Sequence, residues 1–401
     1  MAVELRAIKS TELDDLIVAD ERGFGHAPMT KEQPRSWAEG ELDRTRVAFE
    51  DGAMVGVSRA YSFELTMPGG ALVPAAAVSW VSVIPTHRRR GILTAMINAL
   101  HDDARERGEP LAMLTASESL IYGRFGYGIA TWRLGVTMER ARIRFARPLN
   151  DSGRVRLVSR DEAAKTFPGL YEQARVSRPG MVTRPDFWWP GVFFGFILPP
   201  EKANFLAVHE DADGRADGFV AYQLSDDEWR GGLPEKRLLV WDMHTTNDTA
   251  RAALWEYVLG VDLVEHVAAT NVPLDDPLRH LVVDPRRVRV DFLNDGLWIA
   301  PLDIRAALES RTYAVPGELV LDVDGERYAL EGGPEGAECN ATTRDPDLSC
   351  ARSTLGMCLL GGNRWTDLAH AGLVSEHNDG ALARADLMFI STPPAAMLSF
   401  F

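Results

Sequence analysis

Apolar residues follow two different spacings in roughly the first 145 positions, and these spacings predict helices alternating with strands. The segment STELDDLIVADE carries Leu13, Leu16 and Ile17 on one helical face, and its leading Ser and Thr are typical N-terminal caps. The segment RVAFEDGAMVGVSRAYSFELTMPGGALVPAAAVSWVSVIP predicts strands, with turns at Asp51-Gly52 and at Pro68-Gly69-Gly70. The segment GILTAMINALHDDARERG predicts an amphipathic helix ending at a glycine; its apolar stripe comprises Ile92, Met96, Leu100 and Ala104.

The next part of the chain repeats this order loosely. It predicts a strand and helix in RVRLVSRDEAAKTFPGLYEQAR, a hairpin in NFLAVHEDADGRADGFVAYQL, and a strand, polar link and helix in KRLLVWDMHTTNDTARAALWEYVLGV. The first copy joins strand to helix through Arg88-Arg-Arg-Gly91, whereas the second uses HTTNDTA, which lacks both arginine and glycine. If the two parts are an internal repeat, the second has no anion site.

The last hundred residues change character. They predict a helix in PLDIRAALESRTY, a hairpin in GELVLDVDGERYAL, and short helices in SCARSTLGMCLLGG and RWTDLAHAGLV. We therefore predict an α/β (α+β) chain with mixed central sheets and three domains, at residues 1–145, 146–294 and 295–401.

Composition narrows the function classes. The chain has 401 residues, 46% of them hydrophobic and 25% charged, and no apolar run reaches the roughly 18 residues that a membrane span requires. The three cysteines are late and form no C-x-x-C pair, and VHEDADG lacks the second histidine of a zinc protease motif, so we expect a cytoplasmic protein without metal. The net charge of -15 argues against a nucleic-acid partner. It fits a cationic substrate, or it simply keeps the protein in solution.

One stretch, VSVIPTHRRRGILTAMI, concentrates positive charge in this acidic chain. Backbone N–H groups at a helix N-terminus have no internal partner, and the helix dipole makes that end positive. A glycine there lets an anion approach the backbone, and arginines add charge-assisted hydrogen bonds to phosphate oxygens. A solvated basic patch is the alternative, but the position between an apolar strand and a strong helix favours an anion site.

The same stretch resembles the acetyl-coenzyme A motif of the GNAT superfamily of N-acetyltransferases, Arg/Gln-x-x-Gly-x-Gly/Ala, although Leu93 stands at the last small position. IYGRFGYG resembles the superfamily's tyrosine element. More closely, VIPTHRRRGILT and ASESLIYGRFGYG resemble segments of the Eis (enhanced intracellular survival) acetyltransferases of actinobacteria, and the likeness extends over the whole chain by length and three-part organisation.

The resemblance implies a fold and an activity. Two GNAT-like domains, the second without a working cofactor site, would precede a sterol-carrier-like domain. The enzyme would use acetyl-CoA to acetylate amines of aminoglycosides, of other polyamines or of lysine side chains, and would form a homohexamer. No cysteine lies in the first predicted domain, which favours direct attack of the amine over a cysteine-linked acetyl-enzyme.

The resemblance also implies the cofactor-binding residues. The strand edge that pairs with the pantetheine arm would comprise Val81, Ser82 and Val83, whose side chains could equally be ordinary core. The pyrophosphate turn would comprise Arg89, Arg90, Gly91, Ile92, Leu93 and Thr94. Ser117 and Glu118 match further cofactor contacts.

Two catalytic groups follow from the same resemblance. Tyr122 would protonate the leaving thiolate, because a phenol is neutral at pH 7 and can hand over its proton as the sulfur becomes basic. Tyr127 is its nearest competitor, and plain core packing is the alternative for Tyr122. The general base would be the C-terminal carboxylate of Phe401; alternatively, Phe400 and Phe401 only attach the last domain.

The substrate pocket is implied in the same way. Its residues would be Phe24, His26, Trp37, Trp80 and Phe400. His26 and Phe400 replace acidic groups of a known family member, which would remove negative charge near a polycation and narrow the substrate range. A different class of function stays open at this point: a non-catalytic protein that responds to acetyl-CoA or binds lipid through its third domain.

Overall fold

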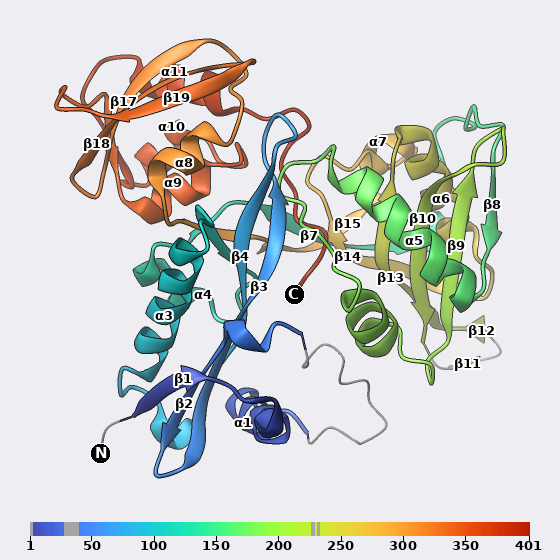
Figure 1. Ribbon diagram of the computed structural model, residues 1–401. Helices are drawn as coiled ribbons and strands as arrows, with labels where there is room; N and C mark the ends of the chain where they lie inside the picture. Colours follow the sequence, from blue (N-terminus) through green and yellow to red (C-terminus); the bar gives the residue numbers. More distant parts are fainter. Residues whose placement is uncertain (1–2, 28–39, 226–228, 231–232) are drawn as a thin grey trace.

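The computed structural model describes residues 3–27, 40–225, 229–230 and 233–401, and Figure 1 shows them arranged in three lobes. The lobes are built on a seven-stranded, a second seven-stranded and a five-stranded sheet. Within the described ranges, no helix is long and apolar enough to cross a membrane.

The first sheet has the strand order β1-β2-β3-β4-β5-β16-β6. Its strands are β1 (Glu4–Ala7), β2 (Thr45–Glu50), β3 (Ala53–Thr66), β4 (Leu72–Val83), β5 (Leu111–Leu114), β6 (Gly128–Ile129) and β16 (Trp298–Pro301). The helices of this lobe are α1 (Leu13–Phe24), α3 (Ile92–Glu106) and α4 (Ser119–Tyr122). The predicted stripe of α3 is confirmed, because its four apolar residues are all buried. Gly108 follows the helix in a left-handed conformation, as expected of a C-terminal glycine.

The predicted Ser/Thr cap of α1 is wrong. Residues Ser10–Glu12 form a separate turn of 3-10 helix, and α1 begins only at Leu13. The carboxylate of Glu12 accepts from the Lys9 backbone N–H at 2.9 Å and also binds the guanidinium of Arg6. The carboxylate at the end of the turn thus accepts from the N–H at its start, so the Ser and Thr hydroxyls are not needed as caps.

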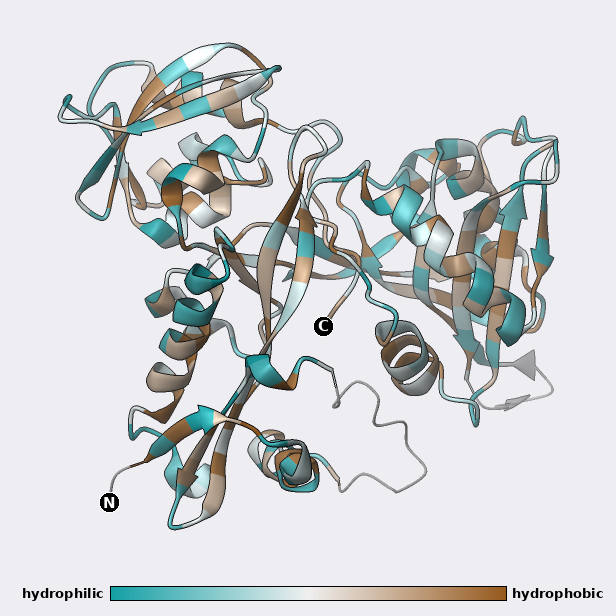
Figure 2. Cartoon of the chain, in the orientation of Figure 1, coloured by the Kyte–Doolittle hydropathy of each residue, from teal (hydrophilic) through white to brown (hydrophobic). Residues whose placement is uncertain are grey.

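The second sheet has the order β15-β7-β14-β13-β10-β9-β8. Its strands are β7 (Trp132–Glu139), β8 (Arg154–Leu157), β9 (Asn204–Glu210), β10 (Ala216–Leu224), β13 (Lys236–Thr245), β14 (Val264–Val272) and β15 (Arg289–Asp295). Its helices are α5 (Arg160–Arg175), a π-helix (Trp189–Ile197), α6 (Asp248–Gly260) and α7 (Leu278–Leu281). A small separate ribbon joins β11 (Trp229–Arg230) to β12 (Leu233–Pro234). Figure 2 shows hydrophilic and hydrophobic stretches alternating along α5, as expected of a helix covering a sheet.

The third lobe has the strand order β19-β18-β17-β20-β21. Its strands are β17 (Gly317–Val323), β18 (Glu326–Gly333), β19 (Gly336–Ala341), β20 (Leu348–Cys350) and β21 (Val374–Glu376). Its helices are α8 (Ile304–Glu309), α9 (Arg352–Cys358), α10 (Trp365–His370) and α11 (Ala381–Phe389). The predicted hairpin is the pair β17–β18, and its alternating residues Leu319, Leu321 and Val323 are all buried.

Two strands connect lobes across the predicted boundaries. β7 lies within residues 1–145 but pairs with β14 and β15 in the second sheet. β16 lies within residues 295–401 but pairs with β5 and β6 in the first sheet. Each of these strands therefore completes the sheet of a neighbouring lobe. The first two lobes are also joined by backbone hydrogen bonds between the end of β3 and residues 180–183.

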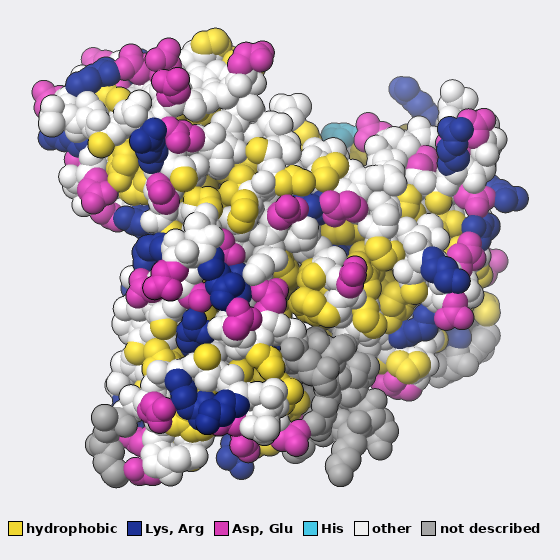
Figure 3. All heavy atoms as spheres, viewed as in Figure 1, with side chains coloured by type: hydrophobic (Ala, Val, Ile, Leu, Met, Phe, Trp, Pro, Cys, Tyr) yellow, Lys and Arg dark blue, Asp and Glu magenta, His cyan; other side chains and the backbone are white. Residues whose placement is uncertain are grey.

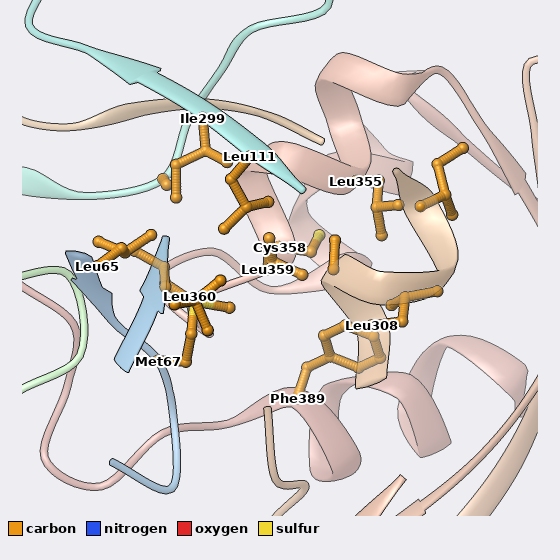
Figure 4. Close-up of a cluster of buried hydrophobic side chains, with 14 of the residues drawn as sticks. Leu65, Met67, Leu111, Ile299, Leu308, Leu355, Cys358, Leu359, Leu360 and Phe389 are labelled. Atoms are coloured by element: carbon orange, nitrogen blue, oxygen red, sulfur yellow. The ribbon is translucent and has the colours of Figure 1, made fainter. Parts of the chain in front are cut away.

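The first and third lobes share one hydrophobic core. Figure 4 shows Leu65 of β3, Met67 just after that strand and Leu111 of β5 facing three side chains of the third lobe, Leu308, Leu355 and Phe389. The remaining labelled side chains, which fill the space between them, are Ile299, Cys358, Leu359 and Leu360. Such continuous packing fixes the third lobe against the first, so the chain that leaves α11 starts from a fixed point.

Candidate active site

The first sheet opens between its two central strands. β4 runs parallel to β5, but their pairing covers only Ala75–Ala77 of β4 and Leu111–Met113 of β5. Beyond Ala77, β4 continues to Val83 and stays paired with β3 on its other side. The edge of β4 that faces β5 therefore has no strand partner among the described residues, and its backbone groups can bind an extended ligand.

A bulge turns the end of β4. Trp80 has φ +54°, and the register with β3 shifts at this point. After the bulge, Val81 and Val83 pack against clusters that include residues of α3, whereas Ser82 is buried on the side of α1. A Cβ added to Gly23 of α1 would lie 2.5 Å from Ser82 Cβ, so helix and strand touch at the glycine. The two valines are thus half-buried against these clusters, while the strand edge that faces β5 has no strand partner among the described residues.

The turn after β4 has the backbone expected of an anion site. Gly91 precedes α3 with φ +81°, and Arg89 also adopts a left-handed conformation, with φ +62°. A side chain at φ +62° costs about 1–3 kcal/mol, which is typical of strained functional turns. Among the described residues no side chain caps α3, so the first N–H groups of the helix have no capping partner; they belong to Ile92, Leu93 and Thr94.

The three arginines of this turn have different partners. Arg88 donates to the backbone oxygens of Val83 at 3.1 Å and Gly23 at 2.7 Å, which ties β4 to α1. Arg90 forms a two-pronged ion pair with Glu50 of β2, which raises the pKa of the guanidinium and lowers that of the carboxyl. For the side chain of Arg89 no partner is found in the described part of the chain. The Arg89 side chain can therefore bind an anion without losing another contact. Arg90 can bind one only if its ion pair with Glu50 breaks.

Tyr122 and Tyr127 are distinguished by what their hydroxyls contact. Tyr127 is fully buried, and its oxygen lies 2.8 Å from Nε2 of the buried His101. Tyr122 ends α4, and among the described residues its hydroxyl has no hydrogen-bond partner. Burial raises the pKa of Tyr122 to about 12, and the charge of Glu118 adds to the rise. Tyr122 is thus a protonated phenol without a hydrogen-bond partner among the described residues, whereas the hydroxyl of Tyr127 is bound to His101.

Ser117 and Glu118 lie between β5 and α4, at the open end of the sheet. Both are exposed, and Glu118 is the residue that precedes the first turn of α4. This places them near the gap between β4 and β5 without committing either side chain to the core.

The chain ends in the middle of the molecule, between the first and second lobes (Figure 1). The ring of Phe401 packs edge-on against Phe63 of β3, with 5.3 Å between ring centroids. Phe63 lies on one face of the first sheet, and Tyr122 packs with Ala76 and Val78 on the opposite face. The two predicted catalytic residues therefore lie on opposite faces of the sheet, near the point where β4 and β5 separate.

The predicted pocket residues fall into three groups. Phe24 is the last residue of α1, and its ring stacks on that of His26 with 5.5 Å between centroids. Trp80 lies beside the guanidinium of Arg59. Phe400 is 38% exposed and contacts the rings of Trp188 and Phe196. Trp37 lies outside the described residues. Figure 3 shows hydrophobic side chains gathered on this face between the first and second lobes.

Asp20 is a titratable group that the sequence patterns did not single out. It lies on α1 close to Ser82 and Arg59, and burial raises the pKa of its carboxyl to about 7. Its Oδ1 is buried and has no hydrogen-bond partner among the described residues. The one sequence signal for Asp20 is its position on α1, one helical turn before Gly23, which contacts β4. Within the same ranges, no group of three or more His, Cys, Asp or Glu side chains is arranged to hold a metal.

Family models match all three lobes. An acetyltransferase (GNAT) domain matches residues 4–130, and a second acetyltransferase (GNAT) domain model matches residues 180–300. A sterol carrier protein domain matches residues 304–398. These matches agree with the sheets, so the fold predicted from the sequence, two GNAT domains and a sterol-carrier-like domain, is confirmed.

Relatives and solved structures agree over the whole length. An uncharacterized N-acetyltransferase of Streptomyces avermitilis is 38% identical over 402 residues, covering 96% of each chain. The N-acetyltransferase Eis of Mycobacterium tuberculosis is 35% identical over 364 residues, covering 87% of each. The crystal structure of Eis1 from Mycobacterium abscessus superimposes with a TM-score of 0.88 at 34% identity, covering 100% of both chains. The chain belongs to the Eis family of GNAT N-acetyltransferases, which confirms the enzymatic interpretation over a non-catalytic binding protein.

Proposed function

We propose that the chain transfers the acetyl group of acetyl-CoA to amines of a cationic substrate, by direct attack within a ternary complex. The substrates would be aminoglycosides, other polyamines or lysine side chains. The observation that carries the proposal is the opening between β4 and β5, with a free backbone edge and with Tyr122 and Phe401 on its two sides. This arrangement lets one face of the sheet receive the leaving group while the other receives the amine.

The turn and strand would position the donor. The N–H groups at the start of α3, with Arg89, would bind the diphosphate, and the edge of β4 after the bulge would bind the pantetheine arm. A backbone N–H on this edge could also stabilise the negative charge that develops on the thioester oxygen. Ser117 and Glu118 would add contacts from the opposite side of the gap.

Two proton transfers would complete the reaction. The carboxylate of Phe401 would take a proton from the ammonium, because only the free amine has the lone pair that attacks the thioester carbon. The C–S bond would then break, and Tyr122 would give its proton to the departing thiolate. The high pKa of Tyr122, about 12, keeps this proton in place at neutral pH until the sulfur demands it.

The first experiment measures free-thiol release from acetyl-CoA with aminoglycosides, polyamines and lysine peptides. Tyr122→Phe should lower kcat by at least about a hundredfold, since general acids contribute roughly that much. Tyr127→Phe is the matched control, and it should mainly lower stability because its hydroxyl binds His101. A larger loss of kcat in Tyr127→Phe would transfer the acid role to that residue. No release with any amine, despite confirmed acetyl-CoA binding, would exclude the proposed substrate classes.

A one-residue extension after Phe401 tests the base. It should abolish most of the transferase activity while leaving acetyl-CoA affinity unchanged, because it moves the carboxylate by one residue. Full activity in the extended protein would refute the role of Phe401.

The pocket residues suggest a narrower substrate range than a strongly acidic pocket would give. Phe24 and His26 form a stacked aromatic pair, and Phe400 lies among aromatic rings. His26→Asp should lower the KM for a polycationic aminoglycoside by about threefold to tenfold, through one added charge at short range. An unchanged KM would show that His26 does not face the substrate.

The family resemblance also predicts a homohexamer. Light scattering coupled to gel filtration tests this directly, and a monomer at micromolar concentration would contradict it.

A further inference from the structure

The C-terminal tail is held by one segment of the second lobe. The backbone N–H of Ala396 donates to the Pro179 oxygen at 2.9 Å. Arg184 donates through Nε to Ser399 Oγ at 2.9 Å, and its Nη2 lies 3.4 Å from the Leu398 oxygen. The indole N–H of Trp188 donates to the Phe400 oxygen at 3.0 Å. Hydrogen bonds from residues 179–188 thus reach the tail up to the residue before the terminal carboxylate.

The guanidinium of Arg184 is itself fixed from behind. It is buried, and its Nη1 and Nη2 donate to the two carboxylate oxygens of Asp242 at 2.7 and 3.2 Å. The rings of Tyr171 and Trp188 lie 3.9 and 4.1 Å from its central carbon. A buried ion pair is a poor way to gain stability, because removing both charges from water costs as much as their attraction returns. The pair instead holds the guanidinium of Arg184 in a fixed orientation, so that it can donate hydrogen bonds to the tail. Apolar side chains could not donate such bonds.

His244 completes this arrangement as a neutral ring. It is buried, and its Nε2 lies 2.7 Å from Asp242 Oδ1 and 3.5 Å from Arg184. Burial lowers the pKa of His244, so it is neutral, and Nε2 must carry the proton that it donates to Asp242. Although burial acts to raise the pKa of Asp242, the charge of Arg184 and the hydrogen bonds from His244 and Arg184 outweigh it and hold the pKa at about 2. From pH 7 to about pH 9.5, Asp242 therefore stays charged and His244 stays neutral.

The last residue is held from both sides. The second lobe binds the carbonyl of Phe400, and the first lobe packs Phe63 against the ring of Phe401. Chain termini usually fray unless they are tied down, and these contacts leave the carboxylate little freedom. The tail arrives from α11 of the third lobe, so all three lobes contribute to its position (Figure 1).

We propose that Arg184 and Trp188, supported by Asp242 and His244, are positioning residues that hold the terminal carboxylate of Phe401 beside the reacting amine. The second GNAT domain would thereby take part in catalysis without binding the cofactor. This inference rests on the proposed role of Phe401 as the general base.

Trp188→Phe is the central variant, because it removes the N–H that binds Phe400 and keeps an aromatic ring. Trp189→Phe is the matched control, since no bond from this neighbouring indole to the tail is found among the described residues. Ser399→Ala is a second variant that removes one bond near the end of the chain and leaves the core intact. Each test variant should lower kcat roughly threefold to tenfold, the value of one hydrogen bond to a buried group, with the KM for acetyl-CoA unchanged.

The pH profile separates positioning from general damage. The loss of kcat should shrink between pH 7 and about pH 9.5, because an amine that is already unprotonated needs no base. A second measurement requires no amine at all: carboxypeptidase A should release free phenylalanine severalfold faster from Trp188→Phe and Ser399→Ala than from wild type and Trp189→Phe. The kinetics use kanamycin A, or the amine from the panel that gives the fastest thiol release.

Removal of Phe401 distinguishes the two proposals. If the shortened enzyme is inactive while Trp188→Phe and Ser399→Ala match wild type in kcat and in phenylalanine release, the positioning proposal is overturned and the base role stands. If the shortened enzyme keeps full activity, the base role fails and the positioning proposal fails with it. A kcat loss that is equal at every pH would also overturn positioning, since it indicates damage unrelated to the base.

Discussion

The two GNAT domains of this chain share a strand–helix unit but differ at the junction between strand and helix. In the first domain, Gly91 leads into α3 with no capping side chain. In the second, Asn247 caps α6 by accepting from the Ala250 N–H at 2.8 Å, and Asp248 places an acidic group in the first turn. The first helix start is open to an anion, whereas the second is satisfied by its own side chain and repels one. A few residues at each junction thus decide whether the helix start is capped by its own side chain.

The strands before these junctions differ in a second way. The opening beside β4 leaves a backbone edge free, whereas the end of β13 carries Asp242 and His244, which support Arg184 and the tail. The same part of the unit therefore serves cofactor binding in one proposal and carboxylate positioning in the other. If Arg184 positions the tail as proposed, the second domain contributes to the reaction without a cofactor site of its own.

The largest expected effect comes from the glycine of the first junction. Gly91→Val places a β-branched residue at φ +81°, which should twist the turn and weaken acetyl-CoA binding by at least about a hundredfold. Gly214→Val is the matched control, because Gly214 has φ +79° in a hairpin of the second domain and similar open space around it. Calorimetry should show one acetyl-CoA per chain in wild type and in the control. Equal losses in both variants would show that strain, and not the anion site, causes the effect.

A smaller effect is expected from the free arginine of the same turn. Arg89→Ala should weaken acetyl-CoA binding about tenfold, the value of one charge-assisted hydrogen bond, and should reduce its salt dependence. Arg90→Ala should cost less, because Arg90 gives up its ion pair with Glu50 to bind phosphate. Arg215→Ala, an exposed arginine of the second domain, is the control. A greater loss in Arg90→Ala would mean that Arg90, and not Arg89, makes the stronger contact with the phosphates.

Two buried histidines should give the domains opposite pH dependence. Burial lowers the pKa of His101 to about 4, so the stability that depends on its neutral form rises with pH from about 4 to 6.5. Burial also acts to lower the pKa of His209, but hydrogen bonds to Asp217 and Asp151 raise it overall, so its contribution is present below pH 6.5 and is lost as pH rises through the raised value.

Urea unfolding of His101→Gln and His209→Gln at several pH values tests this contrast. The free energy of unfolding lost in His101→Gln should grow by roughly 2 kcal/mol between pH 4.5 and 7. The loss in His209→Gln should instead shrink as pH rises above 6.5. Parallel curves for the two variants would contradict the assignment of a neutral and a charged ring.

The smallest effect is expected at the second junction. Asn247→Ala removes the cap of α6 and should lower the free energy of unfolding by about 1 kcal/mol, with acetyl-CoA affinity unchanged. Thermal unfolding and calorimetry on the same preparation measure both. A change in affinity would mean that the second junction takes part in cofactor binding after all.

Several parts of the fold and site could be predicted from the sequence because they depend on neighbouring residues. The stripe of α3, the hairpin β17–β18 and the difference between the two junctions were all visible in local patterns. The caps of α1 could not be predicted, because Glu12 binds the turn in place of the hydroxyls and is itself held by Arg6, which lies outside the segment. Arg90 resembled a free phosphate ligand for the same reason: its partner Glu50 lies 40 positions earlier on β2.

By itself, the sequence determined the turn chemistry, the amphipathic faces and the order of the elements, since these follow from side chains a few positions apart. Only the tertiary structure decided that β7 and β16 complete the sheets of other lobes. Every residue except proline offers the same backbone donor and acceptor, so the sequence does not specify which strands pair. It also decided that Tyr127 is engaged by His101 while Tyr122 is not, and that the tail ends between Phe63 and Trp188. These contacts join residues that are far apart along the chain, and their energy depends on geometry that exists only after the lobes have packed.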